Sequence, residues 1–353
     1  MSEPRTDRCP ICGADNACAM AAADGAAAAC ATCWCAAVEI PPAAMENIPA
    51  RARGRACLCQ RCATKLAAAP AEGVRLTRDP GGRPAVELAS GEDRALIACD
   101  GGQLLSWRTR GHDPLWTASA ATYEPAAPVR GGVPIVFPWF GAHPTDPELP
   151  AHGFARSREW VVVETAASAV TLALRDDEET RALWPHEFSA ELEFELSEAL
   201  RITMRVANAS STALSFEQAM HTYFAVGDVQ AASVHGLEDV AMTEHAREPE
   251  AAWDRSAPLR FRAETDRVFQ GVPAELSLRA PTLQRELSLQ APAARSTIVW
   301  NPWPAKTARL SQMAPDDWRM FCCVETANCK EGAVSLAPGA RHELTLTLRV
   351  AQR

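Results

Sequence analysis

The chain has 353 residues, 47% of them hydrophobic, and carries a formal net charge of −9 with a pI near 5.5. This size and hydrophobic content allow a large folded core, and the acidic charge argues against a general nucleic-acid or membrane-surface binder. No apolar run approaches the roughly 20 residues that a membrane helix requires. The first residues, MSEPRTDRCP, lack the apolar segment of a secretory signal. We therefore expect a cytoplasmic protein without a membrane partner.

Cysteines are concentrated at the N-terminus, where nine of the thirteen precede residue 63. In a reducing compartment such a cluster indicates metal binding more than disulfide formation. Cys9 and Cys12 lie in the turn-forming sequence CPIC, and Cys59 and Cys62 form a second CxxC pair. Two such pairs supply four thiolates, which is the ligand set of a structural zinc site. A redox-active or merely cysteine-rich segment is the alternative.

Cys33 and Cys35 lie in the sequence CATCWC, between the two CxxC pairs. They are candidate ligands of a second metal site, or competitors for the first one. The stretch CATCWCAAVEIP resembles the cysteine-rich CWC family, which is named for its tripeptide. We expect residues 1–66 to form a small zinc-binding module of this type, followed by a linker at residues 67–73 that has few bulky apolar groups.

Residues 74–353 have the apolar pattern of an all-β protein. Apolar and polar residues alternate with period two, which is typical of half-buried strands. The clearest such segments are TLALR (171–175), ELEFEL (191–196), RITMRV (201–206) and LTLTLRV (344–350). Proline and glycine recur between them and predict turns. A short helix is expected at 178–183, and the whole segment is expected to form two twisted antiparallel sheets packed face to face.

The motifs of several common enzyme classes are absent from this segment. It contains no G-x-G-x-x-G, no phosphate-binding P-loop, no H-E-x-x-H and no G-x-S-x-G. Titratable residues instead lie in unusual loop or strand contexts: RGGVPIVFPWFGAHP (130–144), AHGFARSREW (151–160), EQAMHTYFAV (217–226), TDRVF (265–269), VWNPW (299–303) and CCVETAN (322–328). Taken singly, each has an ordinary structural explanation.

Taken in order, RGGVPIVFPWFG, HGFAR, MHTYF, DRVF, WNPW and CVETAN resemble the hexose-6-phosphate mutarotases, a branch of the aldose 1-epimerase superfamily. The resemblance implies a galactose-mutarotase-like β-supersandwich that interconverts the α and β anomers of a hexose 6-phosphate. It also implies that His221 is the catalytic acid and Glu325 the catalytic base.

By the same resemblance, Arg130, His152, Arg156 and Asp266 fall where the family contacts its substrate. One position departs from the family pattern, because Ala151 stands where a substrate-binding glutamine often precedes the HGFAR histidine. This departure removes one expected hydrogen bond and leaves the reaction unchanged.

The chemistry of anomer exchange suits these residue types. Ring opening requires one proton delivered to the ring oxygen and one removed from the C1 hydroxyl, so one acid and one base suffice and no cofactor is expected for catalysis. An arginine guanidinium binds phosphate through paired hydrogen bonds, which favours Arg130 and Arg156 as phosphate ligands over surface ion-pair partners. If MHTYF is a single strand, His221 and Tyr223 share one face.

The sequence allows alternatives for the aromatic side chains and for the function. The aromatic side chains of Trp139, Phe140, Phe154, Tyr223 and Trp303 are candidates to pack on the sugar, although the protein core is their commoner location. The alternative functions are an aldose 1-epimerase for free sugars and a non-catalytic sugar-phosphate sensor. We expect a monomer.

Overall fold

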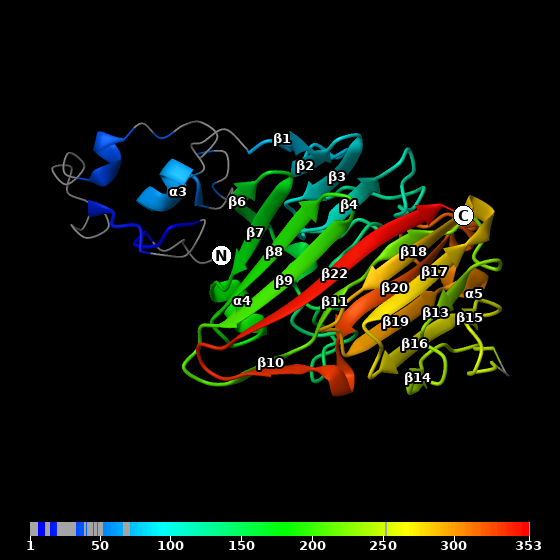
Figure 1. The fold of residues 1–353 in the computed structure, drawn as a ribbon. Coiled ribbons are helices and arrows are strands. Elements are labelled where there is room, and N and C mark those ends of the chain that lie inside the picture. Colours follow the sequence, from blue (N-terminus) through cyan, green and yellow to red (C-terminus); the bar gives the residue numbers. More distant parts are fainter. Residues whose placement is uncertain are drawn as a thin grey trace.

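The structure, a computed structural model, describes residues 6–10, 15–19, 33–38, 40, 45, 48, 52–65, 71–250 and 253–352. Two large antiparallel sheets form a sandwich, and a small N-terminal module lies beside it (Figure 1). The predicted all-β fold is therefore confirmed. None of the helices in this described part is long and apolar enough to cross a membrane.

The nine-stranded sheet has the order β15-β13-β17-β18-β22-β9-β8-β7-β6. Its strands are β6 Val161–Ala166, β7 Ala169–Arg175, β8 Phe188–Leu196, β9 Leu200–Asn208, β13 Ser233–His235, β15 Leu259–Arg260, β17 Glu275–Ala280, β18 Arg285–Gln290 and β22 Arg341–Gln352. The seven-stranded sheet has the order β14-β16-β19-β20-β11-β5, with β12 also paired to β20. Its strands are β5 Ile135–Val136, β11 Gln218–Met220, β12 Tyr223–Ala225, β14 Met242–Glu244, β16 Thr265–Gln270, β19 Ser296–Asn301 and β20 Phe321–Asn328.

Smaller elements complete the described part of the chain. A four-stranded sheet contains β1 Val74–Arg78, β2 Pro84–Ser90, β3 Asp93–Ala98 and β4 Leu104–Arg108, and a two-stranded sheet pairs β10 Leu214–Phe216 with β21 Val334–Leu336. The α-helices are α3 Gln60–Lys65, α4 Glu178–Leu183 and α5 Trp303–Thr307. The 3-10 helices are η2 Trp34–Ala37, η4 Ala155–Ser157, η5 Pro281–Leu283, η6 Asp317–Arg319 and η7 Lys330–Gly332.

The sequence pattern explains the strands and the helix that it predicted. In β8 the apolar residues Leu192, Phe194 and Leu196 are buried while the glutamates between them are half-buried, as expected for one face on the core. The helix α4 begins after Asp177, whose side chain accepts a hydrogen bond from the Thr180 backbone N–H in a reciprocal capping box. The period-two segments and the short helix are therefore confirmed.

Strand β20 is buried along its whole length, and its two faces belong to different environments. Cys322 and Val324 join the main core between the sheets, whereas Cys323 and Ala327 belong to separate apolar clusters. Side chains alternate along a strand, so Glu325 shares the face of Cys323 and Ala327. This second face of the seven-stranded sheet, which we call the outer face, carries the ionisable group away from the main core.

The loops that border the outer face depend on glycines. Gly153 has φ +73°, and a Cβ atom there would lie 2.0 Å from the Phe137 carbonyl oxygen. Gly132 has φ +58°, and its Cβ would lie 2.1 Å from the Leu104 carbonyl oxygen. Only glycine combines this conformation with so close a backbone approach. The RGG and HGFAR sequences therefore fix where the neighbouring Arg130, His152 and Arg156 backbones lie.

The N-terminal module packs on the edge of the nine-stranded sheet. Its apolar residues Ile48, Leu58 and Ala63 form a cluster with Val161 of β6, and the partly buried Val163 packs against the same cluster. Figure 1 shows the module beside this strand. Of the predicted linker, residues 67–70 lie outside the described part. Covering β6 protects the end of the sheet from pairing with another chain.

The glycine geometry makes a prediction about stability. Gly153→Ala should destabilise the protein by about 3 kcal/mol or more, since it adds a backbone clash to an unfavourable φ. Gly82→Ala is the matched control, because Gly82 has φ +80° with no atom within 4 Å of the added Cβ, and should cost about 1 kcal/mol. Denaturant unfolding of both variants measures the difference. Equal losses would contradict the close approach.

Candidate active site

His221 and Glu325 come together because the segments on either side of His221 pair with β20 in one register, which sets His221 opposite Glu325. Met220, the last residue of β11, pairs with Thr326, and Tyr223, the first residue of β12, pairs with Cys323. His221 lies in the gap between them, and its Nε2 atom is 3.4 Å from Glu325 Oε1. MHTYF is therefore not a single strand, because β11 ends at Met220 and β12 begins at Tyr223.

Burial controls the protonation of this pair. Desolvation lowers the pKa of His221 well below its ordinary value, and neighbouring His152 and Arg156 lower it further. Desolvation also raises the pKa of Glu325 well above its ordinary value, with the negative charge of Asp266 adding to the effect. Both shifts favour the neutral forms, so the pair holds one transferable proton without a net charge.

Each member of the pair also has a polar atom without a partner. His221 Nδ1 and Glu325 Oε2 are buried and form no hydrogen bond within the described part of the chain. An unsatisfied buried polar group costs about 1–3 kcal/mol, so native proteins rarely keep one without a functional reason. The site is therefore built at the expense of stability.

Aromatic rings hold the His221 imidazole in place. The Tyr223 ring stacks on it with centroids 4.9 Å apart and an angle of 14° between the planes. Trp300 approaches the imidazole edge-on at 6.1 Å. The expectation that His221 and Tyr223 lie together is thus correct despite the interrupted strand. Trp300 was not singled out from the sequence, although it directly precedes Asn301 in the WNPW motif.

His152 lies next to His221 in a loop with left-handed backbone geometry (φ +66°). Its ring centroid is 5.8 Å from that of His221, and its Nδ1 atom accepts a hydrogen bond from the Gly141 backbone N–H at 3.3 Å. Desolvation, assisted by the positive charges of Arg156 and Lys330, lowers the pKa of His152 to about 3. It is therefore a neutral side chain near neutral pH.

The two predicted arginines are both directed toward the same group of residues. An Nη atom of Arg130 lies 3.5 Å from the Tyr223 hydroxyl, and its Nε donates to the Ser311 carbonyl at 3.0 Å. Arg156 donates to the Ala151 carbonyl at 2.6 Å. Desolvation lowers the pKa of Arg156, while Tyr223 and Glu325 act in the opposite direction. Within the described residues neither arginine is paired with a carboxylate, which excludes the surface ion-pair alternative there.

Asp266 belongs to the outer face but already has a cationic partner. It pairs with Trp300 across β16 and β19, and Lys306 Nζ lies 3.1 Å from its Oδ2 and 3.0 Å from Glu264 Oε1. Lys306 was missed in the sequence, where it lies in α5 just after the WNPW motif. Its ammonium group offsets the negative charge of Asp266, which acts on the buried Glu325.

The other aromatic candidates have different positions. Trp139 and Phe154 are buried in the main core, and Trp303 packs on Trp318 with centroids 4.5 Å apart. Phe140 contacts His152 edge-on at 4.9 Å. Of the five rings proposed from the sequence, only Tyr223 and Phe140 adjoin the predicted site residues.

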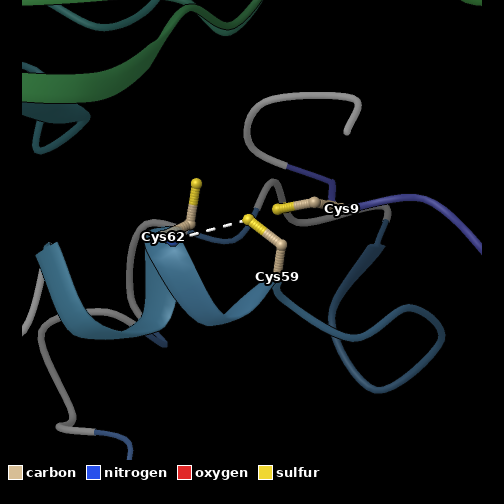
Figure 2. Close-up of side chains that lie close together, drawn as sticks. All are labelled: Cys9, Cys59 and Cys62. Carbon is tan, nitrogen blue, oxygen red and sulfur yellow. Dashed lines mark hydrogen bonds between the residues drawn. The ribbon is translucent and has the colours of Figure 1, made fainter. Parts of the chain in front are cut away.

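The N-terminal module contains a separate group of candidate metal ligands. The Sγ atoms of Cys9, Cys59 and Cys62 are buried and lie within 4.8 Å of one another. Figure 2 shows Cys59 and Cys62 at the start of α3, with Cys9 approaching from another segment, and the Cys62 backbone N–H donating to Cys59 Sγ at 3.5 Å. The fourth predicted ligand of this site, Cys12, lies outside the described residues. Three converging thiols fit a soft metal ion such as zinc.

Comparisons with known proteins agree with this division of the chain. Residues 84–349 match the Aldose 1-epimerase family, and residues 9–64 match the family "Cysteine-rich CWC". A "Putative glucose-6-phosphate 1-epimerase" of Escherichia coli (strain K12) is 32% identical over 268 residues, covering 74% of this chain and 88% of that protein. A protein of the same name from Cenchrus ciliaris is 30% identical over 285 residues, covering 76% and 85%.

A solved structure gives the same result for the fold. The crystal structure of a "putative mutarotase (YeaD)" from Salmonella typhimurium superposes with a TM-score of 0.70 at 26% identity, covering 79% of this chain and 97% of that one. The sandwich, the order of the motifs and these relatives lead to one conclusion. The chain belongs to the aldose 1-epimerase family and carries an N-terminal cysteine-rich CWC domain.

Proposed function

We propose that this protein interconverts the α and β anomers of hexose 6-phosphates. The observation that carries the proposal is the contact between His221 and Glu325, a buried acid–base pair on the outer face with two arginines beside it. The relatives named for glucose 6-phosphate support the same substrate class.

The reaction assigns one proton transfer to each member of the pair. His221 donates a proton to the ring oxygen while Glu325 removes the proton of the C1 hydroxyl, so the bond between C1 and the ring oxygen breaks and a C1 carbonyl forms. Rotation about C1–C2 presents the other face of the carbonyl, and the reverse transfers close the ring as the opposite anomer. No proton is gained or lost, which suits a pair that holds a single proton.

Before the reaction, a proton must move from Glu325 to His221, so that His221 can act as the acid and Glu325 as the base. Desolvation favours neutral His221 and protonated Glu325, which is the reverse of the distribution that the reaction requires. Substrate hydroxyl groups that bond to the unpartnered Nδ1 and Oε2 atoms would stabilise the ionised forms. Proton transfer across the Nε2–Oε1 contact then gives imidazolium and carboxylate, the acid and the base of the reaction.

Arg130 and Arg156 are the proposed phosphate ligands. Both lie near Tyr223 and the catalytic pair, and neither has a carboxylate partner in the described part of the protein. A phosphate would supply the missing anion and form charge-assisted hydrogen bonds with both guanidinium groups. The Ala151 carbonyl orients Arg156, so this position contributes through its backbone where family members often have a glutamine side chain. His152 and Asp266 are proposed as further substrate contacts.

The N-terminal module is proposed to hold a structural zinc ion through Cys9, Cys59 and Cys62, with Cys12 as the fourth ligand. Zinc would supply folding free energy to a segment that has a small core, and it takes no part in the sugar chemistry. We further propose that the protein acts as a monomer in the cytoplasm and does not bind nucleic acid.

Phosphate recognition by the arginines predicts a difference between two substrates. Arg130→Ala and Arg156→Ala should each raise KM for glucose 6-phosphate by about tenfold or more and change KM for glucose little, because each loses about 1.5–3 kcal/mol of charged hydrogen bonding. Arg158→Ala is the control, since Arg158 is two residues away and pairs with Glu179 instead. Equal effects on both sugars would assign the arginines to folding.

The acid and base roles predict losses in turnover. His221→Asn and Glu325→Gln should each lower kcat for glucose 6-phosphate by about a hundredfold or more with little change in KM, because proton transfer acts in the transition state. Wild-type kcat/KM should fall at low pH as His221 binds a second proton, and at high pH as Glu325 loses its proton. His235→Asn, in β13 of the other sheet, is the control. Near-normal kcat in folded variants would refute the assignment.

A further inference from the structure

A second group of cysteines converges in the N-terminal module, apart from the Cys9 group. The Cys18 thiol donates a hydrogen bond to Cys57 Sγ at 3.3 Å. Cys33 and Cys35 lie in a third segment, and the Cys33 thiol interacts with the side chains of Cys18 and Cys35. Four cysteines from three separate segments of the chain are therefore neighbours. Such convergence of soft ligands from distant segments is typical of a metal site.

The buried side chain of Asn16 holds two of these segments together. Its Nδ2 donates to the Cys57 carbonyl at 3.1 Å and to the Thr6 carbonyl at 2.8 Å, while its Oδ1 accepts from the Cys18 backbone N–H at 3.0 Å. The Cys18 and Cys57 backbones are thus fixed on one amide group that is 1% exposed. Local hydrogen bonds that position metal ligands in this way support many metal sites.

The tryptophan of the CWC tripeptide attaches the third segment to the same asparagine. Trp34 Nε1 donates a hydrogen bond to the Asn16 carbonyl at 2.9 Å. Cys33 and Cys35 flank Trp34 in the chain, so this bond places their segment beside Asn16 and the Cys18 segment. The tryptophan of the tripeptide therefore anchors the segment that carries both cysteines.

The ligand chemistry and spacing suit one ion of the zinc type. A tetrahedron of thiolates with Zn–S bonds of about 2.3 Å places its sulfur atoms about 3.8 Å apart. Cys18 and Cys57 are already at 3.3 Å, whereas Cys33 and Cys35 would have to move closer to them to complete the tetrahedron, since no three of these four thiols lie within 4.8 Å of one another. The two groups are distinct in membership, since Cys57 belongs to this one and Cys59 to the other.

We propose that Cys18, Cys33, Cys35 and Cys57 form a second tetrathiolate zinc site, separate from the site of Cys9, Cys59 and Cys62. The module then binds two metal ions and folds around both. Asn16 and Trp34 are positioning residues that contact no metal.

Metal counting on the full chain tests the proposal. Protein purified without oxygen should contain two zinc ions per chain by elemental analysis, and Cys18→Ser combined with Cys57→Ser should reduce the count to one. Cys59→Ser combined with Cys62→Ser should also leave one, which tests the first site independently. Cys99→Ser, a buried cysteine of the sandwich domain, should leave two. One ion in the wild-type chain, or two in the Cys18 and Cys57 variant, would overturn the second site.

Cadmium substitution tests the proposal on the wild-type chain, so its result does not depend on whether a variant module folds. The wild-type chain reconstituted with ¹¹³Cd should give two NMR signals, both at shifts typical of four sulfur ligands, and a single signal would overturn the proposal. Thiol titration distinguishes a metal site from a disulfide between Cys18 and Cys57. A metal-free wild-type chain that lacks two reactive thiols, and in which mass spectrometry detects a Cys18–Cys57 disulfide, would also overturn the proposal. Trp34→Phe should weaken the second cadmium signal selectively, since it removes only the indole hydrogen bond.

Discussion

The placement of Glu325 in the middle of a fully buried strand is the constraint on which the site depends. β20 has no exposed residue, so the carboxyl group can be tolerated only in its neutral form or beside a compensating partner. His221 provides that partner at 3.4 Å, because the common register of β11 and β12 with β20 sets it opposite Glu325. Its backbone N–H donates to the Pro134 carbonyl rather than to β20. The register of these strands therefore creates the acid–base pair.

Charged side chains near His221 and Glu325 also influence the protonation of this pair. Lys306 pairs with Glu264 and Asp266, which limits how far the negative charge of Asp266 can act on Glu325. Arg130 and Arg156 also act on the pair and have no carboxylate partner among the described residues. A protein with a net charge of −9 would repel a sugar phosphate at long range, and these two guanidinium groups are proposed to supply the local attraction that binding requires.

The sequence predicted the β-sandwich and the main site residues because both depend on local patterns. Alternation of apolar residues located β7, β8, β9 and β22, and short motifs identified His221 and Glu325 by resemblance. The partners of these residues could not be predicted, because they depend on register between distant strands. Lys306 reaches Asp266 across 40 positions of sequence, and no local pattern indicates that contact. The burial of Trp139 and Phe154 in the main core likewise could not be predicted, because it depends on which side of a loop faces the core.

The cysteine module illustrates the same limit. Its two CxxC pairs are visible as spacing, whereas the grouping of Cys57 with Cys18 across 39 positions comes only from the folded chain. The module also packs against the sandwich domain. Its apolar residues contact β6, the strand that follows the Arg156 loop. If the proposed zinc supports the fold of the module, its removal would uncover this edge strand, and the protein would then associate with itself.

We expect the protein to accelerate the anomer exchange of a hexose 6-phosphate. Two-dimensional exchange NMR with glucose 6-phosphate labelled with ¹³C at C1 measures this directly, because the α and β carbons give separate signals. We predict exchange cross-peaks that grow with enzyme concentration, and slower exchange for ¹³C-labelled glucose under the same conditions. Exchange of glucose 6-phosphate no faster than in buffer would contradict the account.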